Sequence, residues 1–332
     1  MRKILLFLIL AISCKSYAAI DSYIAHAGGC ISGFWYTNSL EALNYSYEQG
    51  FRYFELDLVE DKYGNIVATH DWDHWLTQTN CDSITPVSKE HFKQHKIYDL
   101  FTPLDMDDIN KWFSKHSDAV LVTDKINDPE KMASLFVDKS RLYMELFSFE
   151  AIEKAKTLGV NYMMSENVLY SIEKNKLKYL IDNDIPAIAI SRRKIEEKEY
   201  KELFTQCKEY DIKIWVFHVN FDSGKDEKFV YENEMQYIYG MYADNWIEEF
   251  SIPLSILDVN SGKLKVYYTG NLLNVESESE IKSIAIYNVS GKLLTYYADI
   301  NNLEFQTLIE HNDGLLIIKI ETTDSSKILK LF

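Results

Sequence analysis

Positive charge is scarce in this chain of 332 residues, where 35 Lys and Arg face 51 Asp and Glu, for a formal net charge of −16. Nucleic-acid binding needs basic patches, so this deficit argues against a nucleic-acid partner. It also argues against electrostatic docking on anionic lipid. A small anionic substrate is still compatible, because a bound cation can invert the local field. Apolar residues make up 47% of the chain, which is enough for a sizeable core.

Long apolar runs are missing beyond the N-terminus, so we expect no transmembrane span. Met1-Arg2-Lys3 is a basic n-region, and the apolar stretch at 4–12 is too short to cross a bilayer. Small residues at Ser16 and Ala18 predict a signal peptide at 1–18. The mature protein is therefore expected to be exported and to be periplasmic, displayed on the cell surface or secreted. A lipid-anchored form through Cys14 is the alternative.

Cysteine is rare, with four residues in the whole chain. No CxxC or Cys/His spacing indicates zinc. Cys30 and Cys81 each follow a strand-like run, and an oxidising export compartment would permit a disulfide between them. The alternative is that both are free thiols. Cys207 is expected to lie unpaired on a helix.

Strand-like and helical segments alternate over most of the chain, at the period of a (β/α)8 TIM barrel. Beyond the runs near 24, 54 and 66, strands are expected at 120–124, 141–146, 162–165, 185–191, 213–220 and 239–244. Helices are expected at 39–50, 149–158, 172–183 and 198–210. These runs make nine strands, which is one more than the eight of such a barrel. The run at 66–70 follows its predecessor through a short turn, so we expect it to form a hairpin added to the barrel.

Four titratable residues lie at or near the ends of the first strand-like runs: His26, Glu55, Asp57 and His70. A barrel strand delivers catalytic side chains to the C-terminal mouth in this way. Two imidazoles can serve as general base and general acid near neutral pH. Two carboxylates at i and i+2 on one strand point the same way and can hold a hard divalent cation.

These blocks resemble the glycerophosphodiester phosphodiesterases in order and spacing. The matching segments are Ala25-His26-Ala27-Gly28, the helix opening at 37–42, Glu55-Leu56-Asp57 and His70-Asp71. The resemblance covers roughly residues 20–250. It implies a TIM-barrel hydrolase of phosphodiesters, with catalytic His26 and His70 and with a calcium or magnesium ion on Glu55 and Asp57.

Two departures from the family pattern concern phosphate binding. The Arg that normally follows the first His is Ala27, which removes a bidentate grip on phosphate. The later Glu-x-Lys block is Asp124-Lys125, so Asp124 is the candidate third metal ligand. The Lys has moved by one position, which on a strand sends it to the other face. Either a bulge restores it or another cation serves. The candidate substrate-binding residues are Lys125, Arg192 and Trp246, with Arg193 as a further cation.

The remaining histidines have no such context. We expect five of them to lie on the surface: His74, His91, His95, His116 and His311. His218 ends the run at 214–217, so it either lines the mouth or packs at the edge of the core.

After Phe250 the composition changes to short alternating strands without a convincing helix. They are expected at 263–268, 272–276, 283–288, 292–297, 315–321 and 327–331. We therefore predict a barrel at 19–250 and a small antiparallel β-sandwich at 251–332. The β-sandwich resembles the C-terminal sorting domains of type IX secretion, which implies outer-membrane secretion machinery as a partner. A generic β-sandwich appendage is the alternative.

The resemblance to the glycerophosphodiester phosphodiesterases implies that the divalent ion neutralises a phosphate oxygen while the two histidines move protons. The sequence leaves open which histidine is the acid. Three other functions are also open: a phospholipase-D-like enzyme, a phosphoinositide-type lyase, and a surface binding protein without turnover. An apolar mouth would favour a lipid substrate. Its candidate side chains are Phe34, Trp35, Tyr36, Trp72, Trp75 and Trp246.

Overall fold

The computed structural model describes residues 22–247, 250, 264–269, 272–288, 293–308 and 316–331. The predicted signal peptide, with Cys14, lies outside the described residues. Contacts within the chain separate a compact unit at 20–251 from a second unit that contains 252–332. Among the helices of the described residues, none combines the length and the apolar character needed to span a bilayer.

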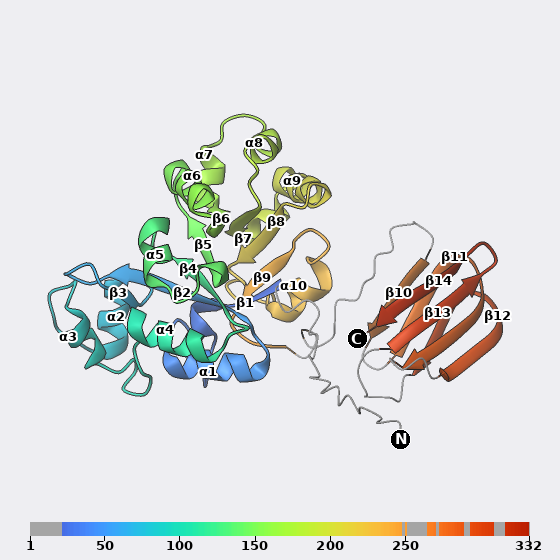
Figure 1. The fold of residues 1–332 in the computed structure, drawn as a ribbon, viewed down its shortest axis with the longest axis horizontal. Coiled ribbons are helices and arrows are strands. Elements are labelled where there is room, and N and C mark those ends of the chain that lie inside the picture. Colours follow the sequence, from blue (N-terminus) through green and yellow to red (C-terminus); the bar gives the residue numbers. More distant parts are fainter. Residues whose placement is uncertain are drawn as a thin grey trace, which may run out of the picture. The chain divides into compact units, whose positions relative to one another are not determined.

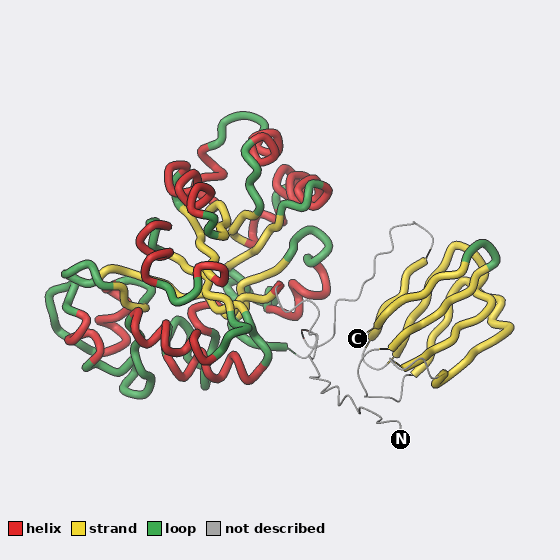
Figure 2. Tube along the Cα trace, in the orientation of Figure 1, coloured by secondary structure: helices red, strands yellow, loops and turns green. Residues whose placement is uncertain are grey.

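Eight parallel strands form the centre of the first unit, with helices outside them (Figures 1 and 2). They are β1 Tyr23–Ala25, β2 Tyr53–Glu60, β4 Val120–Asp124, β5 Leu142–Leu146, β6 Asn161–Ser165, β7 Ala187–Ser191, β8 Lys213–Phe217 and β9 Gly240–Ala243. Strand β1 pairs in parallel with both β2 and β9, so the sheet closes on itself. The predicted TIM barrel is confirmed.

Side chains from six of the barrel strands pack together in the barrel interior. One buried cluster joins Ile24 of β1, Val122 of β4, Met163 of β6, Trp215 of β8 and others. Because barrel strands are covered on both faces, they are rich in apolar residues, and all five residues of β7 are buried. The barrel is therefore a packed core, and only its mouth can hold a ligand.

Helices begin and end where the sequence offers caps. Helix α1 (Leu40–Gln49) starts after Ser39, whose hydroxyl accepts a hydrogen bond from the Ala42 amide, and ends at Gly50. The predicted helix at 172–183 is shortened to α8 (Lys176–Asp182), because Asn175 takes a left-handed conformation and caps it. A separate short helix, α7 (Glu166–Ser171), precedes the predicted range. The other helices are α2 Trp72–Thr79, α3 Lys89–Lys93, α4 Met106–Lys115, α5 Pro129–Leu135, α6 Phe149–Leu158, α9 Lys198–Glu209, α10 Glu227–Asn233, η2 His26–Gly28, η3 Lys139–Arg141 and η4 Arg192–Glu196.

Strand β3 (Ile66–Ala68) turns back antiparallel to β2 and lies outside the barrel, as the hairpin prediction requires. Helices α2 and α3 follow it, and Figure 1 shows the three elements grouped beside the barrel. This insertion has a small core of its own. Its buried members are Val67, Trp75, Val87, Phe92, Ile97 and Phe101.

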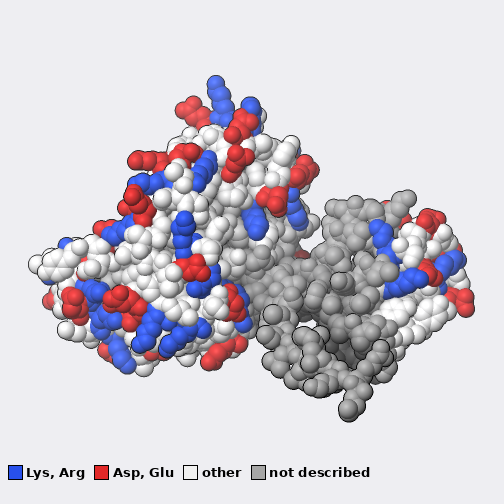
Figure 3. Space-filling model, viewed as in Figure 1, with Lys and Arg blue, Asp and Glu red and all other residues white. Residues whose placement is uncertain are grey.

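Surface charges on the barrel unit are mixed in sign. On the face drawn in Figure 3, Lys and Arg side chains are interspersed with Asp and Glu. Lys89, for example, lies 3.1 Å from Asp107 across the α3–α4 surface. The cations of this face are therefore matched by acidic neighbours rather than gathered into a basic patch.

The second unit is antiparallel, as predicted. Its strands are β10 Leu264–Thr269, β11 Leu272–Asn288, β12 Leu293–Leu308, β13 Leu316–Thr322 and β14 Ser326–Leu331. Two predicted strands are parts of β11, which continues through register shifts between Glu276 and Ser283. The predicted strand at 292–297 extends to 308. Those shifts change which residues face inward, so both Val275 and Ile284 are buried in one core.

Candidate functional site

A cavity of about 170 Å³ opens among the C-terminal ends of the barrel strands. Six of the eight predicted site residues line it: His26, Glu55, Asp57, His70, Asp124 and Lys125. They come from β1, β2, β4 and the hairpin, so residues up to 99 positions apart meet because parallel strands end at one rim.

Three carboxylates form the acidic side of this cavity. Glu55 and Asp57 point the same way from β2, and Asp57 is in register with Asp124 on the neighbouring strand β4. Their oxygen atoms lie within 4.8 Å of one another. Glu55 and Asp57 are only 1% and 2% exposed, so water does little to screen their mutual repulsion.

Two neighbouring segments hold these carboxylates in place. The side chain of Asn38 donates to Asp57 Oδ2 at 2.9 Å and accepts from the Asp57 amide at 3.0 Å. The backbone amide of Ala27 donates to Glu55 Oε2 at 2.6 Å. Both Ala27 and Asn38 have left-handed backbones, with φ of 49° and 47°. These turns aim the donors at the carboxylates.

The remaining oxygen of Glu55, Oε1, is buried and has no hydrogen-bond partner. Burial raises the pKa of Glu55 well above its usual range, and repulsion from Asp57 and Asp124 adds to the shift. An unpartnered buried oxygen beside two more carboxylates is an all-oxygen donor set. Such a set fits a hard divalent cation such as Ca²⁺ or Mg²⁺.

Lys125 reaches the cavity by a left-handed turn, with φ of 67°, directly after β4 ends. Its ammonium lies 2.8 Å from Asp124 Oδ2 and 3.8 Å from Asp57 Oδ1. Burial acts to lower the pKa of Lys125, but the two carboxylates outweigh it and raise the pKa. The one-position shift in sequence is therefore compensated by backbone conformation. A strand bulge is not needed.

His26 lies in the 3-10 turn η2 after β1, with its Nδ1 3.0 Å from Asp244 Oδ1. Asp244 follows β9, the neighbour of β1, and is itself held by the side-chain amide of Asn220 at 3.0 Å. Burial acts to lower the pKa of His26, but the hydrogen bond and charge of Asp244 outweigh it and raise the pKa. The bond occupies Nδ1, so Nε2 is the nitrogen available to a substrate.

His70 shows the same arrangement, with its Nδ1 2.7 Å from Asp71 Oδ2. Asp71 caps helix α2 and also bonds to the backbone and ring of His74. Burial acts to raise the pKa of Asp71, but these hydrogen bonds outweigh it and lower the pKa to about 2. The ring of Tyr36 contacts both catalytic candidates, with centroids 4.7 Å from His26 and 5.4 Å from His70.

Two predicted substrate-binding residues do not reach the cavity. Arg192 is 1% exposed and is paired with Glu234, Glu196 and Asp222, so its charge is already satisfied. Trp246 packs edge-on against Phe51, with centroids 5.0 Å apart, within a cluster of aromatic rings. Neither side chain lies at this cavity, because Arg192 is held in ion pairs and Trp246 in aromatic packing. Among the described residues that line the cavity, Lys125 is the only Lys or Arg.

Other cavity residues were less apparent from sequence. Glu145 on β5 is 6% exposed and lies 3.4 Å from the hydroxyl of Tyr242. A carboxylate inside an apolar strand run was the signal that could have identified it. His218 lines the cavity and contacts Ser191 Oγ at 3.0 Å. Of its two predicted positions, the mouth is therefore the observed one. Of the aromatic side chains expected at an apolar mouth, only Tyr36 lines the cavity.

Cys30 and Cys81 are free thiols, as is Cys207. The alternative of unpaired cysteines therefore holds. Cys30 lies beside Asp244, where its backbone amide donates to the Asp244 carbonyl at 2.7 Å. Cys81 packs against the core of the β3–α2–α3 insertion instead.

Solved structures that resemble the first unit share its barrel. A glycerophosphodiester phosphodiesterase from Thermotoga maritima is 19% identical, with a TM-score of 0.53 over 67% of this chain and 94% of that one. One from Agrobacterium tumefaciens is 18% identical, with a TM-score of 0.50 over 67% and 95%. An Oleispira antarctica phosphodiesterase in complex with the product sn-glycerol-3-phosphate is 19% identical, with a TM-score of 0.53 over 67% and 92%. At such identities the similarity establishes the fold.

Residues 254–330 match a family described as a domain of unknown function, DUF8694. The match covers the second unit and assigns it no activity. No curated protein matches the chain in sequence.

Replacing Asp244 with Asn should lower the pKa of His26, because burial then acts without the opposing carboxylate. A pH titration of the ring signals by NMR in the metal-free protein measures this. The raised pKa stabilises the folded state at acid pH, and this contribution fades as the pH rises through the folded-state pKa. The substitution should therefore cost more stability at about pH 5 than at about pH 9. Asp118→Asn, which removes an exposed carboxylate, is the control. An unchanged His26 titration would contradict this assignment.

Proposed function

We propose that the chain is a metal-dependent hydrolase of glycerophosphodiesters that works by histidine general acid and base catalysis. One observation carries the proposal. Two histidines, each with Nδ1 held by an aspartate, line the same cavity as three carboxylates, one of which has a buried oxygen without a partner. The barrel shared with glycerophosphodiester phosphodiesterases supports it, and the Oleispira antarctica structure contains sn-glycerol-3-phosphate.

Glu55, Asp57 and Asp124 would hold the metal. A divalent ion bound there supplies Lewis-acid stabilisation of the charge that develops on phosphate. The net charge of the cavity also favours this, because three clustered carboxylates would otherwise repel a phosphodiester. Lys125 is the cation of the cavity that can face a phosphate oxygen. It would take the role of the Arg that the family has at the position of Ala27.

His26 and His70 would move the protons of the reaction. One takes the proton of the attacking hydroxyl, which is either water or the neighbouring hydroxyl of the glycerol moiety. The other gives a proton to the departing alkoxide. Their carboxylate partners hold each ring by Nδ1, and Asp244 also stabilises the imidazolium form of His26. Both orders of acid and base are compatible with this geometry.

A small soluble diester suits the site better than a lipid. Four aromatic side chains line the cavity, Tyr36, Phe147, Phe217 and Tyr242, but so do five carboxylates, because Glu145 and Glu166 add to the three candidate metal ligands. Turnover of glycerophosphocholine and of lysophosphatidylcholine, each with and without calcium, tests the proposal directly. Calcium-dependent cleavage of the first supports it. Cleavage of lysophosphatidylcholine alone would favour the phospholipase-D-like alternative, and turnover of neither would favour a binding protein.

Replacing His26 or His70 with Ala should each reduce the rate by roughly 100-fold or more, because each removes a proton-transfer group. The measurement is kcat on glycerophosphocholine, with circular dichroism to check that the fold is intact. His116→Gln is the control, since that ring stacks on Trp112 instead of lining the cavity. Near-wild-type turnover in either alanine variant would refute the acid–base roles.

Chelation should abolish turnover and lower the melting temperature, because a cation held by buried carboxylates binds only the folded state. Adding back Ca²⁺ or Mg²⁺ should restore both. Glu55→Gln and Asp57→Asn should lose the thermal shift on adding metal. Glu60→Gln on the same strand should retain it, since Glu60 is exposed and paired with Lys131. Activity that is indifferent to excess chelator would remove the metal from the proposal.

For the second unit we propose a role in export or attachment, with the chain exported by its N-terminal segment. The separate cores of the two units support a division of roles.

A chain ending at residue 251 should fold and keep its turnover of a soluble diester. In the native host, removing 263–332 should trap the protein in the periplasm, as cell fractionation would measure. A truncated protein that still reaches the surface contradicts the sorting role. A folded but inactive one would mean that the second unit completes the active site.

A further inference from the structure

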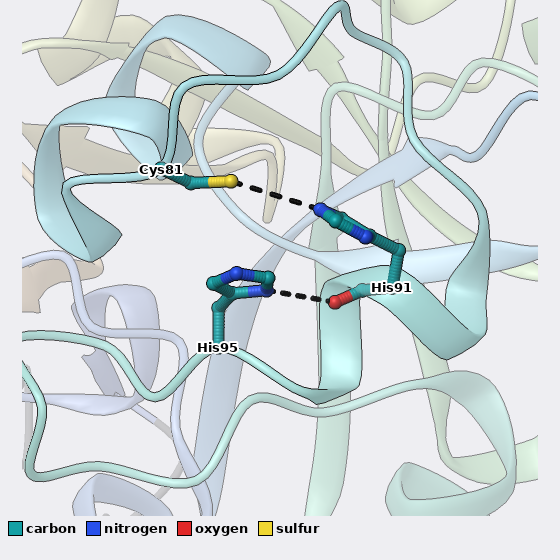
Figure 4. Close-up of side chains that lie close together, drawn as sticks. All are labelled: Cys81, His91 and His95. Atoms are coloured by element: carbon teal, nitrogen blue, oxygen red, sulfur yellow. Dashed lines mark hydrogen bonds between the residues drawn. The ribbon is translucent and has the colours of Figure 1, made fainter.

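A second group of metal-ligating side chains lies in the β3–α2–α3 insertion, outside the cavity. Cys81 follows α2, His91 belongs to α3, and His95 lies just beyond it. Figure 4 shows the three side chains converging. Their ligand atoms all lie within 4.8 Å of one another. His91 and His95, which were expected on the surface, are instead half-buried. The spacing Cys-x9-His-x3-His, with the two histidines a helical turn apart, was the missed signal.

The observed separations suit a tetrahedral ion. Cys81 Sγ lies 3.7 Å from His91 Nε2. Zinc bonds of about 2.3 Å to sulfur and 2.0–2.1 Å to nitrogen, meeting at a tetrahedral angle, put those two atoms about 3.6 Å apart. Cys81 and His91 thus already have the required spacing, and the ligand atom of His95 lies within 4.8 Å of both.

His95 is held in the form that a metal ligand needs. Its Nδ1 lies 3.0 Å from the carbonyl oxygen of His91, and only a protonated nitrogen can donate to a carbonyl. Nε2 of His95 then carries the free lone pair. A second ring nitrogen that donates to a backbone carbonyl is the usual support of a metal-bound histidine.

The surroundings are half-buried and aromatic. The ring of Trp75 lies 6.1 Å from that of His91 and 5.6 Å from that of His95. The other polar side chain in contact is Ser83, whose hydroxyl is 3.1 Å from Cys81 Sγ and 3.2 Å from His91 Nε2. A thiolate and two imidazoles select a borderline-soft ion, in contrast to the oxygen ligands at the barrel mouth.

We propose that Cys81, His91 and His95 bind a zinc ion, with a fourth position filled by water or an added ligand. Binding releases the Cys81 proton to solvent. The ion joins the loop after α2 to α3 across the small core of the insertion. Asp71, the partner of His70, caps helix α2, so the ion would stabilise the segment that carries this histidine. The zinc site does not depend on the proposed phosphodiesterase activity.

The test uses the full-length reduced protein, stripped of metal and then kept in excess Ca²⁺ to saturate oxygen ligands. After addition of Zn²⁺ and dialysis, elemental analysis should find one zinc per chain, and the melting temperature should rise. With Co²⁺ in place of zinc, the spectrum should show a thiolate-to-cobalt charge-transfer band, which carboxylate ligands cannot produce.

Cys81→Ser should abolish the band and the retained zinc, and His95→Gln should weaken zinc affinity at least roughly 10-fold. Cys30→Ser and His116→Gln are matched controls and should behave as wild type. Cys30 belongs to no metal-competent cluster of the described residues, and His116 makes the same kind of ring-to-carbonyl bond without a cysteine nearby. Wild-type protein that retains no zinc, or zinc retained unchanged in both Cys81→Ser and His95→Gln, would overturn the assignment.

Discussion

The burial of Glu55 and Asp57 beside each other at the barrel mouth is the constraint to which the surrounding residues respond. Buried carboxylates are costly unless they are hydrogen-bonded or paired with a cation. Asn38 and the Ala27 amide satisfy part of this requirement, and Lys125 supplies one positive charge. One Glu55 oxygen is left without a partner. The site thus has more negative charge than its protein partners neutralise, and a divalent cation would balance this charge and bind the free oxygen.

Unusual backbone conformations concentrate at this mouth. Ala27, Tyr36, Asn38, Lys125 and His218 all have positive φ, between 47° and 67°. Such residues cost of order 1–3 kcal/mol each and persist only where the surrounding structure holds them. Ala27 and Asn38 direct donors at the carboxylates, and the other three bring a side chain to the cavity from a strand end or loop. Precise placement of the site therefore rests on backbone turns as much as on the strands.

The two histidines reach the cavity from different parts of the barrel unit. His26 follows a true barrel strand, and its partner Asp244 follows the strand beside it. His70 comes from the hairpin insertion, and its partner Asp71 also caps α2. The order of the insertion therefore bears on one half of the proposed acid–base pair. This connection makes a metal ion in the insertion relevant to the barrel although the two sites are separate.

Local patterns in the sequence determined the alternation of strands and helices, the hairpin, and the positions of His26, Glu55, Asp57, His70 and Asp124. These depend on apolar runs, caps and strand ends, all of which are short-range. Only the tertiary structure decided which groups the long side chains reach, because this depends on backbone turns and on neighbouring segments. Lys125 reaches the cavity through a left-handed residue, whereas Arg192 is paired with Glu196 of its own helix and with Asp222 and Glu234 from other segments. The meeting of Cys81 with His91 and His95 depends likewise on how two helices pack, and side-chain reach and packing partners are not encoded in local periodicity.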